Sequence, residues 1–117
     1  MKFGFENLEV WQLAVDFAVF VRDLTKQFPD DEKFGLVSQM NRAATSIALN
    51  LAEGSGRKTK KDFAQFVRVS LGSLLEVVAC ERIAFAKNYK LSERDKFAEK
   101  SQALYFKLIA LEKYLRK

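Results

Sequence analysis

Apolar residues recur at helical spacing along almost the whole chain, and only one proline, Pro29, and five glycines interrupt them. The clearest pattern lies between about Glu6 and Gln27, where steps of four and three residues alternate. It consists of Val10, Ala14, Phe17, Val21, Leu24 and Phe28. This spacing is typical of a helix that packs in a bundle. Because no segment alternates like a strand bounded by turns, the sequence predicts an all-α fold.

Breaks in the pattern divide the chain into four helical segments. The first ends at Phe28, because the residue before a proline is disfavoured in the α region. The others are predicted at about Leu36–Glu53, Lys60–Lys87 and Glu93–Arg116. Short connections favour antiparallel neighbours. We therefore predict one domain, residues 1–117, folded as an antiparallel up-down-up-down four-helix bundle.

Small polar residues and glycines suggest how these helices begin, end and pack. Gly54 fits the left-handed position after a helix, which glycine enters without a Cβ penalty. Thr59, three residues before Asp62, predicts a capping box, and Ser92 precedes the fourth segment in the same way. Gly72 lies in the middle of the third segment, where glycine is unfavourable. We expect another helix to pass close to it.

The first segment carries more apolar surface than one seam needs. Further apolar residues cover most of its circumference: Trp11, Leu13, Val15, Ala18, Val19 and Phe20. A helix this apolar needs partners on more than one side. In so small a domain, a second copy of the chain is an expected source of that cover, so we predict a homo-oligomer.

Basic residues concentrate in the second half of the chain. Residues 1–53 hold five Lys or Arg and eight Asp or Glu, whereas residues 54–117 hold fifteen and seven. The segment Gly54–Arg68 alone has a charge of +4, against +5 for the whole chain. Lys60 and Lys61 fall in the first turn of a helix, where the dipole disfavours cations but free N–H groups bind anions.

These charges favour binding of RNA or DNA through phosphate contacts, which give affinity without reading the sequence. The candidate residues are Arg42, Arg57, Lys58, Lys60, Lys61 and Arg68. A solvated basic surface explains the charge alone equally well. No aromatic residue alternates with the cations as a base-stacking platform would require, since Phe63 and Phe66 have core spacing.

Catalytic and metal-binding motifs are missing from the sequence. There is no histidine, which removes the usual general base, the usual zinc ligand and the di-iron bundle motif. Cys80, in an apolar helix, is typical of a small core residue. Glu53 and Glu76 alone make a weak cation site, and we expect Glu53 to pair with Arg57 or Arg42. We predict no enzyme, no cofactor and no metal.

No apolar run approaches the roughly 20 residues that cross a bilayer. The N-terminal residues also lack the uncharged apolar stretch of a signal peptide. We therefore expect a cytoplasmic protein with no membrane partner.

Several elements of the chain together resemble one bacterial family. They are Leu8-Glu9-Val10-Trp11-Gln12, Phe28-Pro29, Glu32-x-Phe34-Gly35-Leu36-x-x-Gln39, Arg42-Ala43-Ala44-x-Ser46-Ile47-x-x-Asn50-x-Ala52-Glu53-Gly54, Arg57, and Gly72-Ser73-x-x-Glu76. The pattern resembles the four-helix-bundle proteins encoded in intervening sequences of large-subunit ribosomal RNA genes. Relatives of these include the accessory protein of diversity-generating retroelements. The family often has two adjacent arginines where this chain has Asn41 and Arg42.

The resemblance implies a homopentameric ring with a basic surface, and its retroelement relatives bind nucleic acid and a reverse transcriptase. Our first hypothesis is a non-catalytic homo-oligomer that binds nucleic acid, as a ribonucleoprotein or reverse-transcriptase accessory factor. The alternative is a protein-interaction scaffold whose basic face docks an acidic protein, such as a reverse transcriptase, without nucleic acid.

Overall fold

The computed structural model describes all residues from 1 to 117 and contains helices but no strands. The four long helices are α1 (Glu9–Thr25), α2 (Leu36–Ser55), α3 (Lys60–Ala86) and α4 (Arg94–Leu115). Two short 3-10 helices, η1 (Gly4–Asn7) and η2 (Asp30–Glu32), precede α1 and α2. The all-α prediction is confirmed, and the helix bounds differ from the expected ones by three residues at most.

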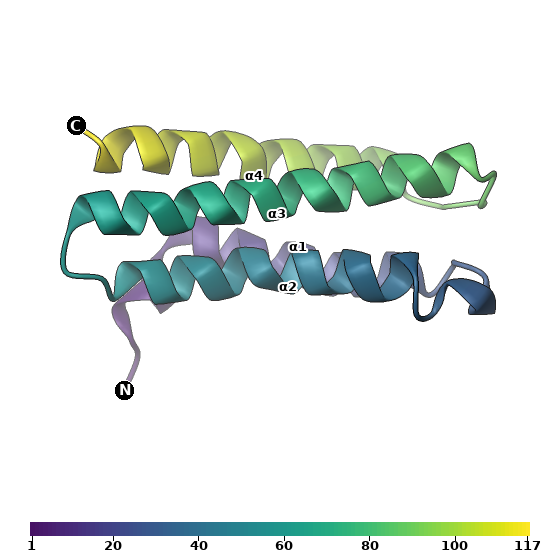
Figure 1. Cartoon of the computed structure of the whole chain (residues 1–117), viewed down its shortest axis with the longest axis horizontal. Coiled ribbons are helices and arrows are strands. Elements are labelled where there is room, and N and C mark those ends of the chain that lie inside the picture. The colour runs from purple at the N-terminus through teal and green to yellow at the C-terminus, as the bar shows by residue number, and fades with distance from the viewer.

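The helices form an elongated bundle of 44 × 27 × 20 Å. Helices that follow one another in the chain lie side by side and run in opposite directions, and α4 also packs against α1 (Figure 1). This is the predicted up-down-up-down arrangement. It places both chain ends and the α2–α3 loop at one end of the bundle, and the other two connections at the opposite end (Figure 1).

The core is a single cluster of buried apolar side chains to which all four helices contribute. All six residues of the predicted seam in the first segment are buried. The surplus apolar residues of α1 pack partly against the same core, and only Val15 and Val19 are exposed. The bundle itself therefore covers most of the surface that we expected a second copy to cover.

Helix α3 is apolar on its outward face as well as its inward one. Val69, Leu75 and Ile83 are exposed there. By length and composition α3 is long and apolar enough to cross a membrane, so the expectation that no segment has this property is wrong. The uninterrupted apolar runs in α3 are short, but only a few polar residues separate them. A core helix of a water-soluble bundle passes the same test, so the finding is weak evidence for a membrane.

The two helical glycines have the opposite roles to those expected. Gly54 is buried within α2 and has no positive φ. A Cβ at Gly54 would lie 2.6 Å from Cβ of Phe66 and 2.9 Å from Cδ1 of Phe63, so the missing side chain lets α2 meet α3. A Cβ at Gly72 would meet nothing within 4 Å. The expected close helix at Gly72 is therefore absent from this chain.

Of the two predicted capping boxes, the one at Thr59 is half formed, because Thr59 caps α3 but the Asp62 side chain does not accept from the Thr59 amide. The Thr59 side chain accepts a hydrogen bond from the Asp62 amide at 3.0 Å. The cap at Ser92 is wrong, because its amide and hydroxyl both donate to Oε1 of Gln27, at 2.8 and 3.1 Å. Glu93, in a left-handed conformation, precedes α4 instead.

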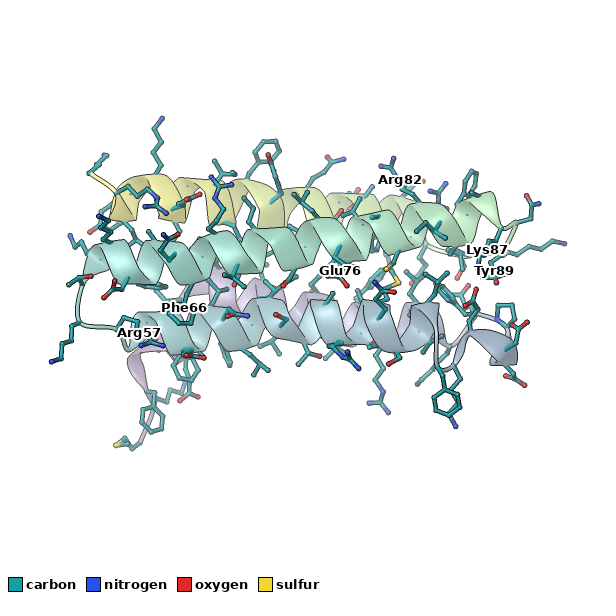
Figure 2. The ribbon with its side chains drawn as sticks, in the orientation of Figure 1. Arg57, Phe66, Glu76, Arg82, Lys87 and Tyr89 are labelled. Carbon is teal, nitrogen blue, oxygen red and sulfur yellow. The ribbon has the colours of Figure 1, made fainter.

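A buried carboxylate ties the two connections together at the end of the bundle opposite the α2–α3 loop. Oε2 of Glu32 accepts hydrogen bonds from Lys87 Nζ at 2.8 Å and from the Tyr89 hydroxyl at 2.5 Å. Lys87 and Tyr89 are labelled at this end of the bundle in Figure 2. Oε1 accepts from the Leu36 amide at 3.3 Å. The hydrogen bonds from Lys87 and Tyr89 lower the pKa of Glu32 to about 2. The same contacts raise the pKa of Lys87 and of Tyr89.

Replacing Gly54 with alanine should destabilise the protein by about 1–3 kcal/mol, because the added methyl group collides with Phe63 and Phe66. Gly56→Ala is the matched control, since its Cβ would make only an ordinary contact, 3.6 Å from the Glu53 carbonyl oxygen. We expect the control to change the free energy of unfolding by less than about 0.5 kcal/mol. Urea unfolding measures the change in the free energy of unfolding for each variant. Equal changes in Gly54→Ala and Gly56→Ala would contradict the assigned role of Gly54.

The Glu32 cluster should stabilise the protein between about pH 5 and pH 9. Because the pKa of Glu32 is lowered in the fold, its contribution is complete above the usual carboxyl pKa of 4.5 and declines as the pH falls toward 2. The pKa values of Lys87 and Tyr89 are raised in the fold, so their contributions to stability are complete below the usual pKa values of these groups. These contributions are lost as the pH rises through the raised pKa values.

This pH dependence can be measured as the difference in unfolding free energy between wild type and Glu32→Gln. The difference should be constant near neutral pH and shrink below the usual carboxyl pKa. Glu99→Gln, at an exposed carboxylate without an ion pair, is the control and should show no such trend. A wild-type advantage that is the same at pH 3 and pH 7 would contradict the assignment.

Candidate nucleic-acid interface

Cations from two parts of the sequence meet at the end of the bundle that carries the chain termini. The α2–α3 loop and the first turn of α3 supply one group, and the last turn of α4 with the two residues after it supplies the other. We call these residues the basic end: Arg57, Lys58, Lys60, Lys61, Lys113, Arg116 and Lys117. The two groups touch, since Lys60 Nζ lies 5.1 Å from the centre of the Tyr114 ring and Arg116 donates to Gln65 at 3.3 Å.

Arg57 is held by contacts within the chain. Its Nη2 donates to Oε2 of Glu53 at 2.8 Å, and its guanidinium carbon lies 4.5 Å from the centre of the Phe66 ring (Figure 2). Glu53 thus pairs with Arg57 rather than with Arg42. These contacts explain the sequence element Ala52-Glu53-Gly54-x-x-Arg57. Gly54 leaves space for Phe66, and Arg57 lies over the Phe66 ring. Arg57 has a structural role whatever else it binds.

Arg68 is also engaged, in a cluster that joins α3 to α4. Its Nε and Nη2 each lie 3.2 Å from an oxygen of Glu112, which is only 7% exposed. Arg116 reaches the same carboxylate from within α4, at 3.0 Å. A buried carboxylate needs such partners, since an unpaired charge is costly away from water. Arg68 therefore balances Glu112 and adds less free charge than the sequence indicates.

The three loop lysines, Lys58, Lys60 and Lys61, are exposed and form no ion pair. The backbone amides of Lys60 and Lys61 have no acceptor in the chain, as expected at the first turn of a helix. Free amides, the positive end of the helix dipole and three ammonium groups therefore coincide. This combination suits an anion with several oxygen atoms, such as a phosphate.

The structure does not bring Arg42 to this cluster. Arg42 lies on the exposed face of α2, about 20 Å along the helix axis from its C-terminal end. It has no ion-pair partner, and it borders a shallow pocket with Thr45, Ser46, Leu49 and Asn50. A ligand that reaches both the loop and Arg42 must follow α2 for most of its length.

Sequence reasoning missed the contribution of α4. Lys113, Tyr114, Arg116 and Lys117 are more than fifty residues from the loop in sequence, yet the antiparallel packing of α3 and α4 brings them beside it (Figure 1). The predicted topology already implied this, because the end of the fourth helix must adjoin the start of the third. No aromatic residue alternates with the loop cations in sequence, but the fold brings Tyr114, which is 57% exposed, beside Lys60.

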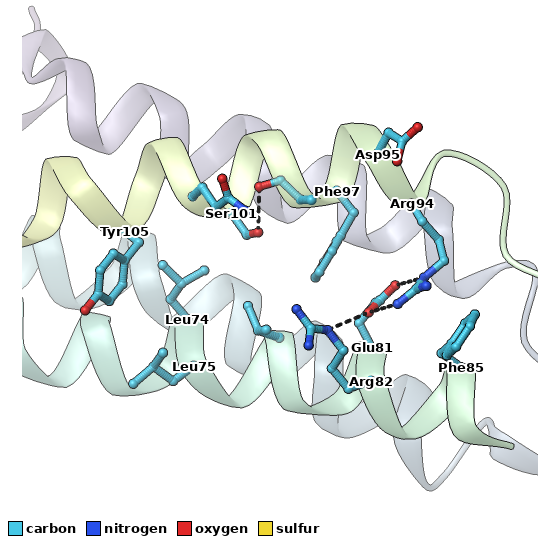
Figure 3. A pocket seen from close by; sticks show the side chains of 13 residues that line it. Leu74, Leu75, Glu81, Arg82, Phe85, Arg94, Asp95, Phe97, Ser101 and Tyr105 are labelled. Carbon is cyan, nitrogen blue, oxygen red and sulfur yellow. Dashed lines mark hydrogen bonds and ion pairs between the residues drawn. The ribbon is translucent and has the colours of Figure 1, made fainter.

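A second concave feature lies between α3 and α4, toward the other end of the bundle. This groove has a volume of about 600 Å³ and mainly apolar walls that include Leu75, Val78 and Phe97 (Figure 3). At its edge, buried Glu81 accepts two hydrogen bonds from Arg94, at 2.6 and 3.0 Å. The pairing with Glu81 raises the pKa of Arg94.

Phe85 and Arg82 flank this groove. Phe85 is 53% exposed, and the Arg94 guanidinium carbon lies 3.8 Å from the centre of its ring. Arg82 is exposed and approaches Glu81 only loosely, at 3.7 Å (Figure 3). The groove thus combines an apolar floor with an accessible cation.

The other residues considered for catalysis or metal binding, Cys80 and Glu76, do not form a site with other side chains. Cys80 is buried, and burial raises the pKa of its thiol, which disfavours the reactive thiolate. Nowhere do three or more Cys, Asp or Glu side chains gather in an arrangement that could hold a metal ion. Glu76 accepts a hydrogen bond from Gln39 at 3.3 Å rather than facing Glu53.

Comparison with known proteins agrees with this arrangement of helices. Residues 6–111 match the family described as 23S rRNA-intervening sequence protein. No curated protein matches the sequence significantly. The match covers all of α1, α2 and α3 and most of α4, including the loop and the Glu53–Arg57 element. The chain belongs to the 23S rRNA-intervening sequence protein family.

Proposed function

We propose that this protein is a non-catalytic, cytoplasmic homo-oligomer whose basic end binds RNA or DNA through phosphate contacts. One observation supports this most directly: Lys58, Lys60 and Lys61 lie at the start of α3, where the helix amides are free, and have no carboxylate partner. Folding does not require cations at this position, and the helix dipole opposes them. A polyanion would use both the charges and the amides.

The contacts and positions of the proposed binding residues divide them into three groups. Lys58, Lys60 and Lys61 are free to contact phosphates, together with Lys113 of α4 and Lys117 beyond its end. Arg57 and Arg68 position the helices through Glu53 and Glu112. Arg42 contacts only a ligand that extends along α2.

The outward face of α3 is the proposed contact between copies. Val69, Leu75 and Ile83 share this face with Gly72 and Ala79, and one exposed charged residue, Glu76, lies among them. Exposed apolar residues that gather on one face often mark a contact with another protein. Gly72 fits the same proposal, since no atom of its own chain approaches it and a neighbouring copy could. A pentamer, as the family resemblance implies, would carry five basic ends.

Multiple basic ends would bind one polyanion more tightly than a single end, because later contacts form at high effective concentration. Such a protein suits a role as a ribonucleoprotein component or a reverse-transcriptase accessory factor. These cellular roles are part of the proposal.

The groove between α3 and α4 favours the alternative function, a scaffold for an acidic protein. Its apolar walls and the exposed Arg82 would fit an apolar side chain next to a carboxylate on the partner. The two functions differ in the surface used, since the groove lies near Phe85 and Arg94 and the basic end lies at the other end of α3.

Replacing Lys58, Lys60 and Lys61 together with alanine should weaken nucleic-acid binding and lower its salt dependence. The slope of log K against the logarithm of the salt concentration is negative, and each lost phosphate contact makes it less steep by about one unit. We therefore expect the slope to become less steep by about two to three units. Titrations of a labelled RNA at several salt concentrations measure this slope.

A matched control removes the same charge from the opposite end of the bundle, as the triple variant Lys26→Ala, Lys33→Ala and Lys90→Ala. It should leave the slope within about half a unit of wild type. Equal losses in the two triple variants would indicate diffuse attraction without a site. If wild type shows no salt-sensitive binding to RNA or DNA, the nucleic-acid function is wrong and the scaffold function is favoured.

Placing a charge on the outward face of α3 should dissociate the oligomer. Light scattering at micromolar concentration should give a multiple of the 13.4 kDa chain mass for wild type, and the mass of one chain for Val69→Glu combined with Ile83→Glu. Phe106→Glu, at an exposed apolar residue of α4, is the control and should keep the wild-type mass. A wild-type protein with the mass of one chain would remove this part of the proposal.

A further inference from the structure

Tyr114 places an aromatic ring among the cations of the basic end. The residue is 57% exposed, and the Lys60 ammonium lies 5.1 Å from the centre of its ring. Its near neighbours in the sequence are Lys113 in the last turn of α4 and Arg116 and Lys117 just after it. The ring is thus surrounded by groups suited to phosphates, while more than half of the residue is open to solvent.

Packing within the chain does not account for this position. The neighbouring residue Leu115 is buried and Leu111 packs against the core, whereas Tyr114 belongs to neither set. Its hydroxyl has no hydrogen-bond partner in the protein. An exposed aromatic ring between lysines is the combination that single-stranded nucleic acids use, because bases stack on the ring and phosphates pair with the cations.

We infer that the basic end binds single-stranded nucleic acid by stacking an unpaired base on Tyr114. This rests on the proposed function and adds the class of ligand, which phosphate contacts alone leave open. In a duplex each base is covered on both faces by its neighbours, so a rigid duplex can offer phosphates to the lysines but no base to the ring. A strand end, loop or unpaired stretch can offer both.

Three probes separate stacking from charge: a 15-nucleotide oligouridine, an abasic strand of the same length, and a 15-base-pair RNA duplex. Their affinities are measured at one moderate salt concentration for wild type, Tyr114→Leu and Tyr114→Trp. Tyr114→Leu should weaken oligouridine binding by about 5- to 100-fold, the usual range for one stacked base, and change abasic-strand and duplex binding less than about twofold. Tyr114→Trp should retain oligouridine binding.

Lys58→Ala is the matched control, because it removes a charge from the same surface without touching the ring. It should weaken all three probes to a similar extent. Circular dichroism confirms that each variant keeps its helices.

If Tyr114→Leu weakens the three probes equally, or none of them, stacking on Tyr114 is wrong while the phosphate site stands. If wild type binds the abasic strand as tightly as oligouridine, the inference is likewise overturned. If wild type binds none of the probes in a salt-sensitive way, both the proposed function and this inference fail.

Discussion

The close contact between α2 and α3 is the constraint on which the rest of the structure depends. It is possible because Gly54 leaves space for Phe63 and Phe66, and it continues where the Ser70 hydroxyl donates to the Ile47 carbonyl at 2.9 Å. Both contacts fix the register of the two helices. Since the α2–α3 loop closes this pair, the same register decides where the loop cations lie and which of them are free.

The basic end shows that counting charges overestimates what a surface offers a ligand. Two of the six candidate residues already form ion pairs within the chain, Arg57 with Glu53 and Arg68 with Glu112. Both pairs help to hold helices in place. The lysines remain free. This division follows the chemistry of the side chains, because a planar guanidinium forms two-pronged pairs and stacks on rings, whereas an ammonium stays hydrated.

The sequence predicted the helices and the topology well, because apolar spacing and Thr59 report local structure directly. It failed where a residue's role depends on what a distant segment places beside it. Gly54 looked like a helix end and Gly72 like a close contact, and only the packing of α2 on α3 shows the reverse. Of the candidate site, the loop was found but Tyr114 was not, because its proximity to Lys60 arises from the fold.

The position of the chain ends has a practical consequence for how this protein is handled. Both termini lie at the same end of the bundle as the α2–α3 loop (Figure 1). An affinity tag or fluorescent fusion at either terminus would therefore crowd the surface whose binding is to be measured. A polyhistidine tag would also add charge there as the pH falls. A fluorophore attached to the exposed side chain at position 90, at the far end, would leave that surface open.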